Sequence, residues 1–167
     1  MSVANLYEGW ARANLRARDR IADLDAAALA LKGDPDGWPI WAVAAHIAGA
    51  RVYWLCGVLG EPGAASTPFP SASGYGWEDE PGTARSADEL VWAIDSSWTI
   101  VEDCLDRWAP ADLEQAFNRP AATGVQRHTR ASVLARLLAH DHYHWGAISA
   151  LLGLNGLAPL DPWRLPA

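Results

Sequence analysis

The sequence has little positive charge, few cysteines and no long apolar run. Its 13 Lys and Arg stand against 20 Asp and Glu, which gives a formal net charge of −7. Nucleic acids and anionic membranes need a basic patch on their protein partner, so this charge argues against both. No stretch approaches the ~18 consecutive apolar residues of a transmembrane helix. The N-terminus also lacks the basic and apolar regions of a signal peptide, so we expect a cytoplasmic protein.

The two cysteines, Cys56 and Cys104, lie in separate apolar segments and have no CxxC spacing. This placement favours two buried free thiols over a disulfide or a zinc ligand. The sequence also shows no Ser-His-Asp order, no glycine-rich phosphate loop and no paired-carboxylate signature. Its chemistry must therefore come from other residues.

The composition is that of an ordinary globular protein. Half of the 167 residues are apolar and a fifth are charged, which predicts a single domain over residues 1–167 with a sizeable core. Ten tryptophans are unusually many. Most should serve packing, and some should line a pocket.

Apolar residues recur at helical spacing in four segments, 4–31, 39–60, 86–108 and 130–152. We expect a break near Asp23–Asp25, a capping box of Ser86 with Glu89, and a helix end at Gly153. The irregular stretch 109–129 should hold a helical turn at 111–115 and an extended piece near 125–128. We predict an all-α fold, a four-helix bundle. The long connection 61–85 lets helices two and three run parallel while the others alternate.

Three of the five histidines lie in the stretch A-H-D-H-Y-H at residues 139–144. His140 and His144 are four residues apart and so share one helix face. His142 is about 200° away from His140 and should point to the opposite side. Two neutral imidazoles buried without partners would be unfavourable, so another group must satisfy them. The pair falls into an apolar stripe made of Val133, Leu137, Ile148 and Leu151.

His46 lies beside the apolar stripe of the second helix and is the natural third member. His46, His140 and His144 would then offer three nitrogen ligands with an open fourth position, the catalytic arrangement for zinc. Nickel, cobalt and ferrous iron also accept imidazoles. The alternative is that these are core or surface histidines with protein partners only.

Two charged residues near the histidines have two interpretations each. Asp141 either orients the far nitrogen of a ligand, and is then also the candidate catalytic base, or is an exposed helix carboxylate. Arg51 either binds an anionic substrate group or forms a surface ion pair. Arg130, near the start of the fourth helix, carries the same ambiguity as Arg51.

The stretches W-P-I-W-A-V-A-A-H-I-A-G-A-R and T-R-A-S-V-L-A-R-L-L-A-H-D-H-Y-H-W-G-A-I-S-A-L-L-G-L-N-G-L resemble the DinB-like superfamily of metal-binding four-helix bundles. The resemblance implies an up-down-down-up bundle, often a homodimer, with a divalent metal on His46, His140 and His144. Related proteins include thiol-dependent transferases and isomerases that use bacillithiol or mycothiol. Many similar sequences carry Gln or Glu where this chain has Ala147, which weakens the transfer of any particular activity.

We therefore expect a divalent-metal-binding protein, with zinc or nickel as the metal. The first functional hypothesis is a metal-dependent thiol S-transferase or hydrolase that acts on a small-molecule substrate with a low-molecular-weight thiol. The segment 61–85 would cover its site. The second is a non-catalytic metal-binding stress-response or sensor-like protein. The third is a bundle whose histidines are only structural.

Overall fold

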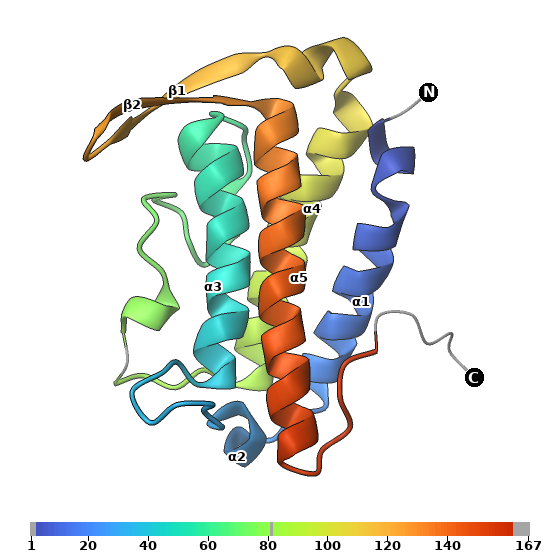
Figure 1. The fold of residues 1–167 in the computed structure, drawn as a ribbon, viewed down its shortest axis with the longest axis vertical. Coiled ribbons are helices and arrows are strands. Elements are labelled where there is room, and N and C mark those ends of the chain that lie inside the picture. The colour runs from blue at the N-terminus through green and yellow to red at the C-terminus, as the bar shows by residue number, and fades with distance from the viewer. Residues whose placement is uncertain (1–2, 81, 162–167) are drawn as a thin grey trace.

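The computed structural model describes residues 3–80 and 82–161. Four long helices pack side by side (Figure 1): α1 (Glu8–Ala22), α3 (Ile40–Val52), α4 (Ala87–Arg107) and α5 (Arg130–Leu154). The short helix α2 (Ala26–Leu29) lies between α1 and α3 in the chain. The predicted, mostly helical fold is thus confirmed. Among the described residues, none of the helices combines the length and apolar character needed to cross a membrane.

The structure departs from an all-α fold in one place, a two-stranded hairpin above the helix ends (Figure 1). Strands β1 (Ala116–Ala121) and β2 (Gly124–Thr129) pair antiparallel, with Ala116 opposite Thr129 and Ala121 opposite Gly124. The extended piece expected near 125–128 is therefore one arm of this hairpin. The helical turn expected before it is the 3₁₀ helix Pro110–Glu114.

Local capping chemistry explains where most helices start. Asp25 accepts a hydrogen bond from the Ala28 amide at 2.8 Å, so a new helix begins at the predicted break. The Ser86 amide donates to the Glu89 carboxylate at 2.9 Å, and the Ser86 hydroxyl accepts from the Glu89 amide, which confirms the capping box. The predicted end at Gly153 was wrong. Helix α5 continues to Leu154, and the glycine with a left-handed backbone is Gly156, whose φ is +73°.

The second predicted helix, 39–60, consists of two elements. Helix α3 is followed directly by a π-helix, Tyr53–Val58. A Cβ on Gly57 would collide with the carbonyl oxygen of Ala72, so this turn packs directly against the backbone of the crossover. The wider π turn sets Tyr53 and Trp54 against a pocket described below.

The crossover between α3 and α4 lies along the outer side of α3 (Figure 1). Its Glu61 is buried and accepts hydrogen bonds from Arg107 of α4 and Arg130 of α5, each at 2.9 Å. Phe69 packs over Gly49, and the one-turn helix Trp77–Asp79 packs on α3. The crossover is therefore anchored along its length. Arg130 thus forms an ion pair with Glu61 that holds the crossover against α5.

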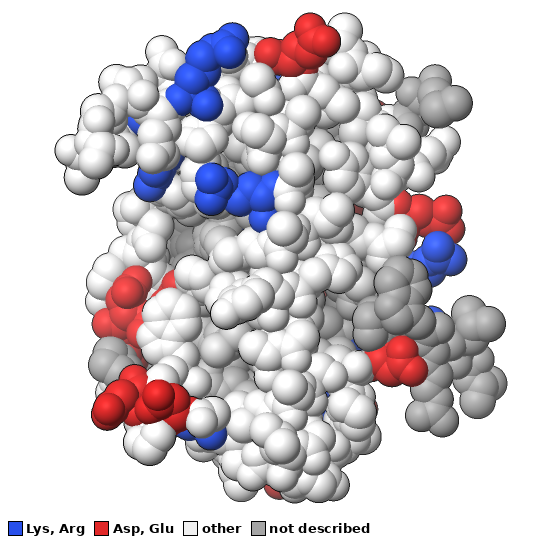
Figure 2. Space-filling view, viewed as in Figure 1, with Lys and Arg blue, Asp and Glu red and all other residues white. Residues whose placement is uncertain are grey.

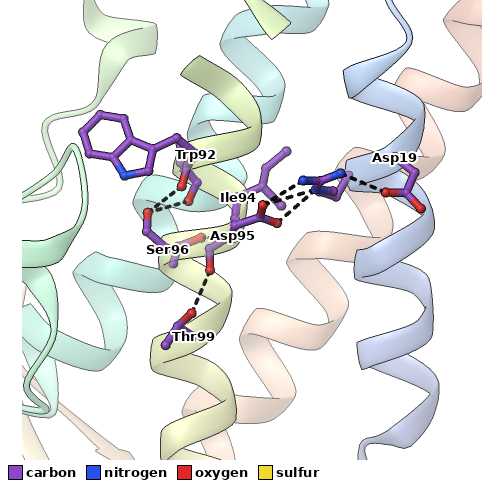
Figure 3. A network of polar contacts seen from close by, with 9 residues as sticks. Asp19, Trp92, Ile94, Asp95, Ser96 and Thr99 are labelled. Atoms are coloured by element: carbon purple, nitrogen blue, oxygen red, sulfur yellow. Dashed lines mark hydrogen bonds and ion pairs between the residues drawn. The ribbon is translucent and has the colours of Figure 1, made fainter. Parts of the chain in front are cut away.

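Helix α1 is joined to α4 by a polar network on the outside of the bundle (Figure 3). Arg18 donates to the carboxylate of Asp95 at 3.1 and 3.2 Å and to Asp19 at 3.1 Å. Farther along α4, the hydroxyls of Ser96 and Thr99 donate back to carbonyl oxygens of their own helix. These groups are partly or fully exposed, so they contribute little to stability compared with the core. The largest fully buried apolar side chains include Ile47, Leu55, Ile94, Leu134 and Ile148.

Candidate metal centre

Helices α3 and α5 bring His46, His140 and His144 together. One ring nitrogen from each residue lies within 4.8 Å of those of the other two. Nε2 of His46 is 2.9 Å from Nε2 of His140, and the His140 and His144 ring centroids are 4.4 Å apart. Within residues 3–80 and 82–161, this is the one such group of three His, Cys, Asp or Glu side chains.

The spacing predicted core positions for His140 and His144, but both are only half-buried. The buried stripe of α5 keeps Val133, Leu137 and Ile148 from the prediction, but Asp141 and Trp145 take the buried positions that were predicted for His140 and His144. His140 and His144 are half-buried at its edge, and His46 is half-buried on the matching side of α3. This edge position is what allows the three imidazoles to reach a pocket.

His142 lies outside this group. It is exposed, and its Nδ1–H donates to the Leu138 carbonyl oxygen at 2.8 Å on the same helix. The prediction that it turns away from His140 and His144 is confirmed.

Glu78 supports His46 through a contact that no sequence pattern indicated. Its Oε1 lies 2.7 Å from Nδ1 of His46, and only 6% of its side chain is exposed. A carboxylate there accepts a hydrogen bond from Nδ1–H, which keeps the proton on Nδ1 and leaves the lone pair of Nε2 directed at the centre. Gly76 makes room for this carboxylate, because a Cβ on Gly76 would lie 2.7 Å from Cδ of Glu78.

Asp141 and Arg51 form a fully buried ion pair behind the histidines. Oδ2 of Asp141 accepts from Nη2 of Arg51 at 2.7 Å, from its Nε at 2.9 Å and from Trp10 Nε1 at 2.8 Å. Nη2 of Arg51 also donates to Asn14 at 2.7 Å. Burial acts to raise the pKa of Asp141, but the Arg51 charge and the hydrogen bonds outweigh it and lower that pKa. Asp141 is thus a buried anion, not an exposed helix carboxylate, and Arg51 is not at the surface.

The second oxygen of Asp141 faces His140. Oδ1 of Asp141 is 3.8 Å from Nδ1 of His140, which is longer than a hydrogen bond. Both atoms are buried, and neither has another hydrogen-bond partner among the described residues. A small rotation of the imidazole would join them. Asp141 is therefore placed to orient His140 as Glu78 orients His46.

The donor set fits a divalent cation. Zinc–nitrogen distances of about 2.0–2.1 Å put tetrahedral ligand atoms about 3.3 Å apart, and the observed range, from 2.9 Å to 4.8 Å, brackets that value. Burial, followed by the neighbouring His140 and His46, lowers the pKa of His144 to about 4. His144 is thus neutral at pH 7, the form that binds metals.

A pocket of about 390 Å³ opens over the centre. Its lining combines two of the histidines, His46 and His140, with Glu78 and with three other parts of the chain. These parts are the π-helix, the crossover and strand β1, which contribute Tyr53, Trp54, Phe69, Ala72–Gly76 and Arg119. Neither Asp141 nor Arg51 is among the described residues that line it. The crossover covers the site from one side, as the sequence predicted.

The cysteines are free, as predicted, and belong to neither the histidine group nor the pocket lining in the described chain. Cys104 is buried in the core and Cys56 is half-buried. Burial, with the charge of Glu61 as a smaller cause, raises the pKa of Cys104 to about 12. These thiols are therefore protonated at neutral pH.

The chain was compared with family models, with solved structures and with curated proteins. A family model described as the DinB superfamily matches residues 9–148. The crystal structure of a DinB-like protein from Bacillus cereus ATCC 10987 is similar, with a TM-score of 0.67 and 19% sequence identity over 95% of each chain. At this identity the similarity concerns the fold alone. A search of curated proteins found no match.

Proposed function

The chain belongs to the DinB superfamily, and we propose that it binds a divalent metal ion through His46, His140 and His144. The observation that carries this proposal is the convergence of three imidazole nitrogens, all within 4.8 Å of one another, beside a pocket that His46 and His140 line. Zinc and nickel are the metals we propose, because both accept imidazole ligands.

We also assign the bundle the up-down-down-up order of helices. The support is Figure 1, in which α3 and α4 both start at the end that carries α2, whereas α1 and α5 finish there. The long crossover makes this order possible, because it returns the chain along α3 before α4 begins. In this order α3 and α5 are antiparallel neighbours, which places His46 level with the His140 and His144 pair.

We propose that the protein is a metal-dependent enzyme of the thiol S-transferase or hydrolase type. Three protein ligands leave a coordination position for a substrate or co-substrate, and the pocket of about 390 Å³ suits a small molecule. When bound, the metal ion supplies Lewis-acid chemistry, lowering the pKa of a coordinated thiol or water and polarising the substrate. A low-molecular-weight thiol is the co-substrate that S-transfer would require.

The chain's own residues prepare the ligands. Glu78 fixes the proton of His46 on Nδ1, so that Nε2 is free to bind. Asp141, with Oδ1 3.8 Å from Nδ1 of His140, would orient that ring in the same way after a small rotation of the imidazole, and Arg51 and Trp10 keep Asp141 charged and in place. Asp141 and Arg51 are fully buried. We therefore assign Asp141 the role of positioning His140, in place of proton transfer, and Arg51 the role of positioning Asp141, in place of substrate binding.

The second candidate is a non-catalytic metal-binding stress-response or sensor-like protein with the same ligands. The open pocket beside His46 and His140 favours the enzyme. The cytoplasmic location and the homodimer remain predictions, and light scattering of the purified protein would test the latter.

Activity measurements on three proteins would test the enzyme proposal. Wild type, His46→Ala and His142→Ala would be screened for transfer of low-molecular-weight thiols and for ester and amide hydrolysis, with zinc, with nickel and with chelator. We expect an activity that needs metal, is lost in His46→Ala and is retained in His142→Ala. An activity that persists in His46→Ala contradicts the proposal. Metal binding without any such activity favours the sensor-like alternative.

A further inference from the structure

Arg119 reaches the pocket from strand β1, on the side where the hairpin meets the π-helix. Its Nε donates to the hydroxyl of Tyr53 at 2.6 Å, and its Nη1 donates to Oε1 of Gln126 at 3.0 Å. The guanidinium carbon lies 5.5 Å from the Tyr53 ring centroid and 5.2 Å from that of Trp54. These contacts fix the orientation of the guanidinium group at the pocket wall.

Arg119 has no acidic partner in the described chain, although the protein as a whole is acidic. The same holds for Arg136 of α5, whose guanidinium carbon lies 4.7 Å from the Trp54 ring centroid. Among the described residues, no carboxylate lies within ion-pair distance of either arginine, and the one carboxylate lining the pocket, Glu78, contacts His46. Figure 2 shows a hollow on this face with basic side chains gathered at its upper rim and acidic side chains below it. The positive charge at this end of the pocket is therefore uncompensated.

His128 lies beside the same positive charges. Its ring lies 5.0 Å from that of Trp54. Burial lowers the pKa of His128, and the charges of Arg136 and Arg119 lower it further. An anion near Trp54 would relieve the repulsion among these groups.

The free hydrogen-bond donors of Arg119 suit an oxyanion. A guanidinium group carries five N–H bonds, and two of those of Arg119 are used by Tyr53 and Gln126. The remaining donors are one N–H of Nη1 and two of Nη2, and donors of this group can contact the oxygens of a carboxylate or phosphate. The same pocket is lined by His46 and His140, so one bound molecule would contact Arg119 at one end of the pocket and these histidines at the other.

We propose that Arg119 binds a carboxylate or phosphate group of the small molecule that occupies this pocket, and that the charge of Arg136, beside Trp54, adds to the positive potential there. The molecule's anionic group lies at the hairpin end, and its reacting group lies at the three histidines. This inference rests on the proposed function and adds to it a substrate class, small molecules with an oxyanion group.

The hairpin offers a matched control. Arg119 pairs with Gln126 across the two strands, whereas Arg127 pairs with Asn118. Because successive residues of a strand point to opposite faces, Arg127 lies on the face opposite Arg119. Arg127→Gln therefore removes one positive charge from the same hairpin without changing the pocket wall.

Titrations with inorganic phosphate and with acetate would test the inference. Zinc-loaded wild type, Arg119→Gln, Arg136→Gln and Arg127→Gln would be titrated at constant ionic strength, and binding followed by NMR of arginine Nε–H and backbone amide signals around the pocket. We expect saturable shifts in wild type and about tenfold or greater loss of affinity in Arg119→Gln, the effect of losing a charge-assisted bidentate contact. Arg136→Gln should lose less, and Arg127→Gln should match wild type. The preferred anion distinguishes a phosphate from a carboxylate group.

Unchanged affinity in Arg119→Gln, or an equal loss in Arg127→Gln, would overturn the inference. If Arg119→Gln is unfolded, Arg119→Lys replaces it, because lysine keeps the charge but lacks the fork and should still bind the anion more weakly. Metal content, measured on the same samples, separates the two proposals. If the protein holds metal but its anion binding does not depend on Arg119, this inference is refuted and the proposed function is not. If anion binding depends on Arg119 but the protein holds no metal, the proposed function is refuted and this inference is not.

Discussion

Replacing Glu78 with Gln should weaken metal binding without unfolding the protein. The substitution keeps the size of the side chain but removes the negative charge that lies 2.7 Å from Nδ1 of His46. Carboxylates in this position typically contribute 10- to 100-fold to metal affinity, which corresponds to about 1.4–2.7 kcal/mol. Because 27% of the His46 side chain is exposed, water replaces part of the lost contact. We therefore expect a loss of about tenfold, at the lower end of that range.

The assay is competition for zinc with a chromophoric chelator at pH 7, with circular dichroism to verify folding. Glu80→Gln is the matched control, because it makes the same charge change two residues away on a carboxylate that pairs with Arg85 at the surface. Wild-type affinity in a folded Glu78→Gln variant would refute the argument. An equal loss in Glu80→Gln would refute it too, because the effect would then be one of general charge.

Three further predictions concern the surroundings of the centre. Arg51→Met leaves the buried Asp141 carboxylate without its main partner, so the free energy of unfolding should fall by about 3–5 kcal/mol, or roughly 10 °C in Tm. Thermal unfolding of the double variant Arg51→Met with Asp141→Leu should show partial recovery of Tm, and no recovery would contradict the pairing. Gly76→Ala should lower zinc affinity as Glu78→Gln does, because its Cβ would displace the Glu78 carboxylate, whereas Gly82→Ala, with nothing within 4 Å of its Cβ, should not. Burial raises the pKa of Cys104 to about 12, so iodoacetamide at pH 8.5 should alkylate it about a thousandfold more slowly than in the unfolded chain, and faster as pH rises toward 12. Mass spectrometry measures the alkylation rate, and equal rates in the folded and unfolded chains would be inconsistent with a buried thiol.

The helical part of the fold was predictable because its signals are local. Asp25, Ser86 and Glu89 satisfy backbone donors of their own helices, so their sequence positions are informative. The hairpin was harder, because most of its residues are exposed and give no alternating apolar pattern. Pro120 within β1 also argued against a strand.

The three histidines were identified correctly as neighbours because two of them share a helix face and the third lies on an adjacent helix. Their surroundings were not predictable in the same way. Asp141 occupies a core position that an apolar residue normally fills, and it does so because Arg51 and Trp10, both distant in sequence, satisfy its charge. Glu78 lies in an irregular crossover without periodicity, so no pattern linked it to His46. Non-local partners of this kind require the folded structure.

The central claim is that His46, His140 and His144 jointly hold one divalent metal ion beside an open pocket. The most direct test is a crystal structure of the zinc-loaded protein with anomalous diffraction at the zinc edge, alongside that of His144→Ala. We expect one strong anomalous peak about 2.0–2.1 Å from a nitrogen of each of the three imidazoles, with a remaining position that faces the pocket, and a lost or weakened peak in the variant. A dry, closed histidine cluster without a peak, or a metal bound elsewhere, would contradict it.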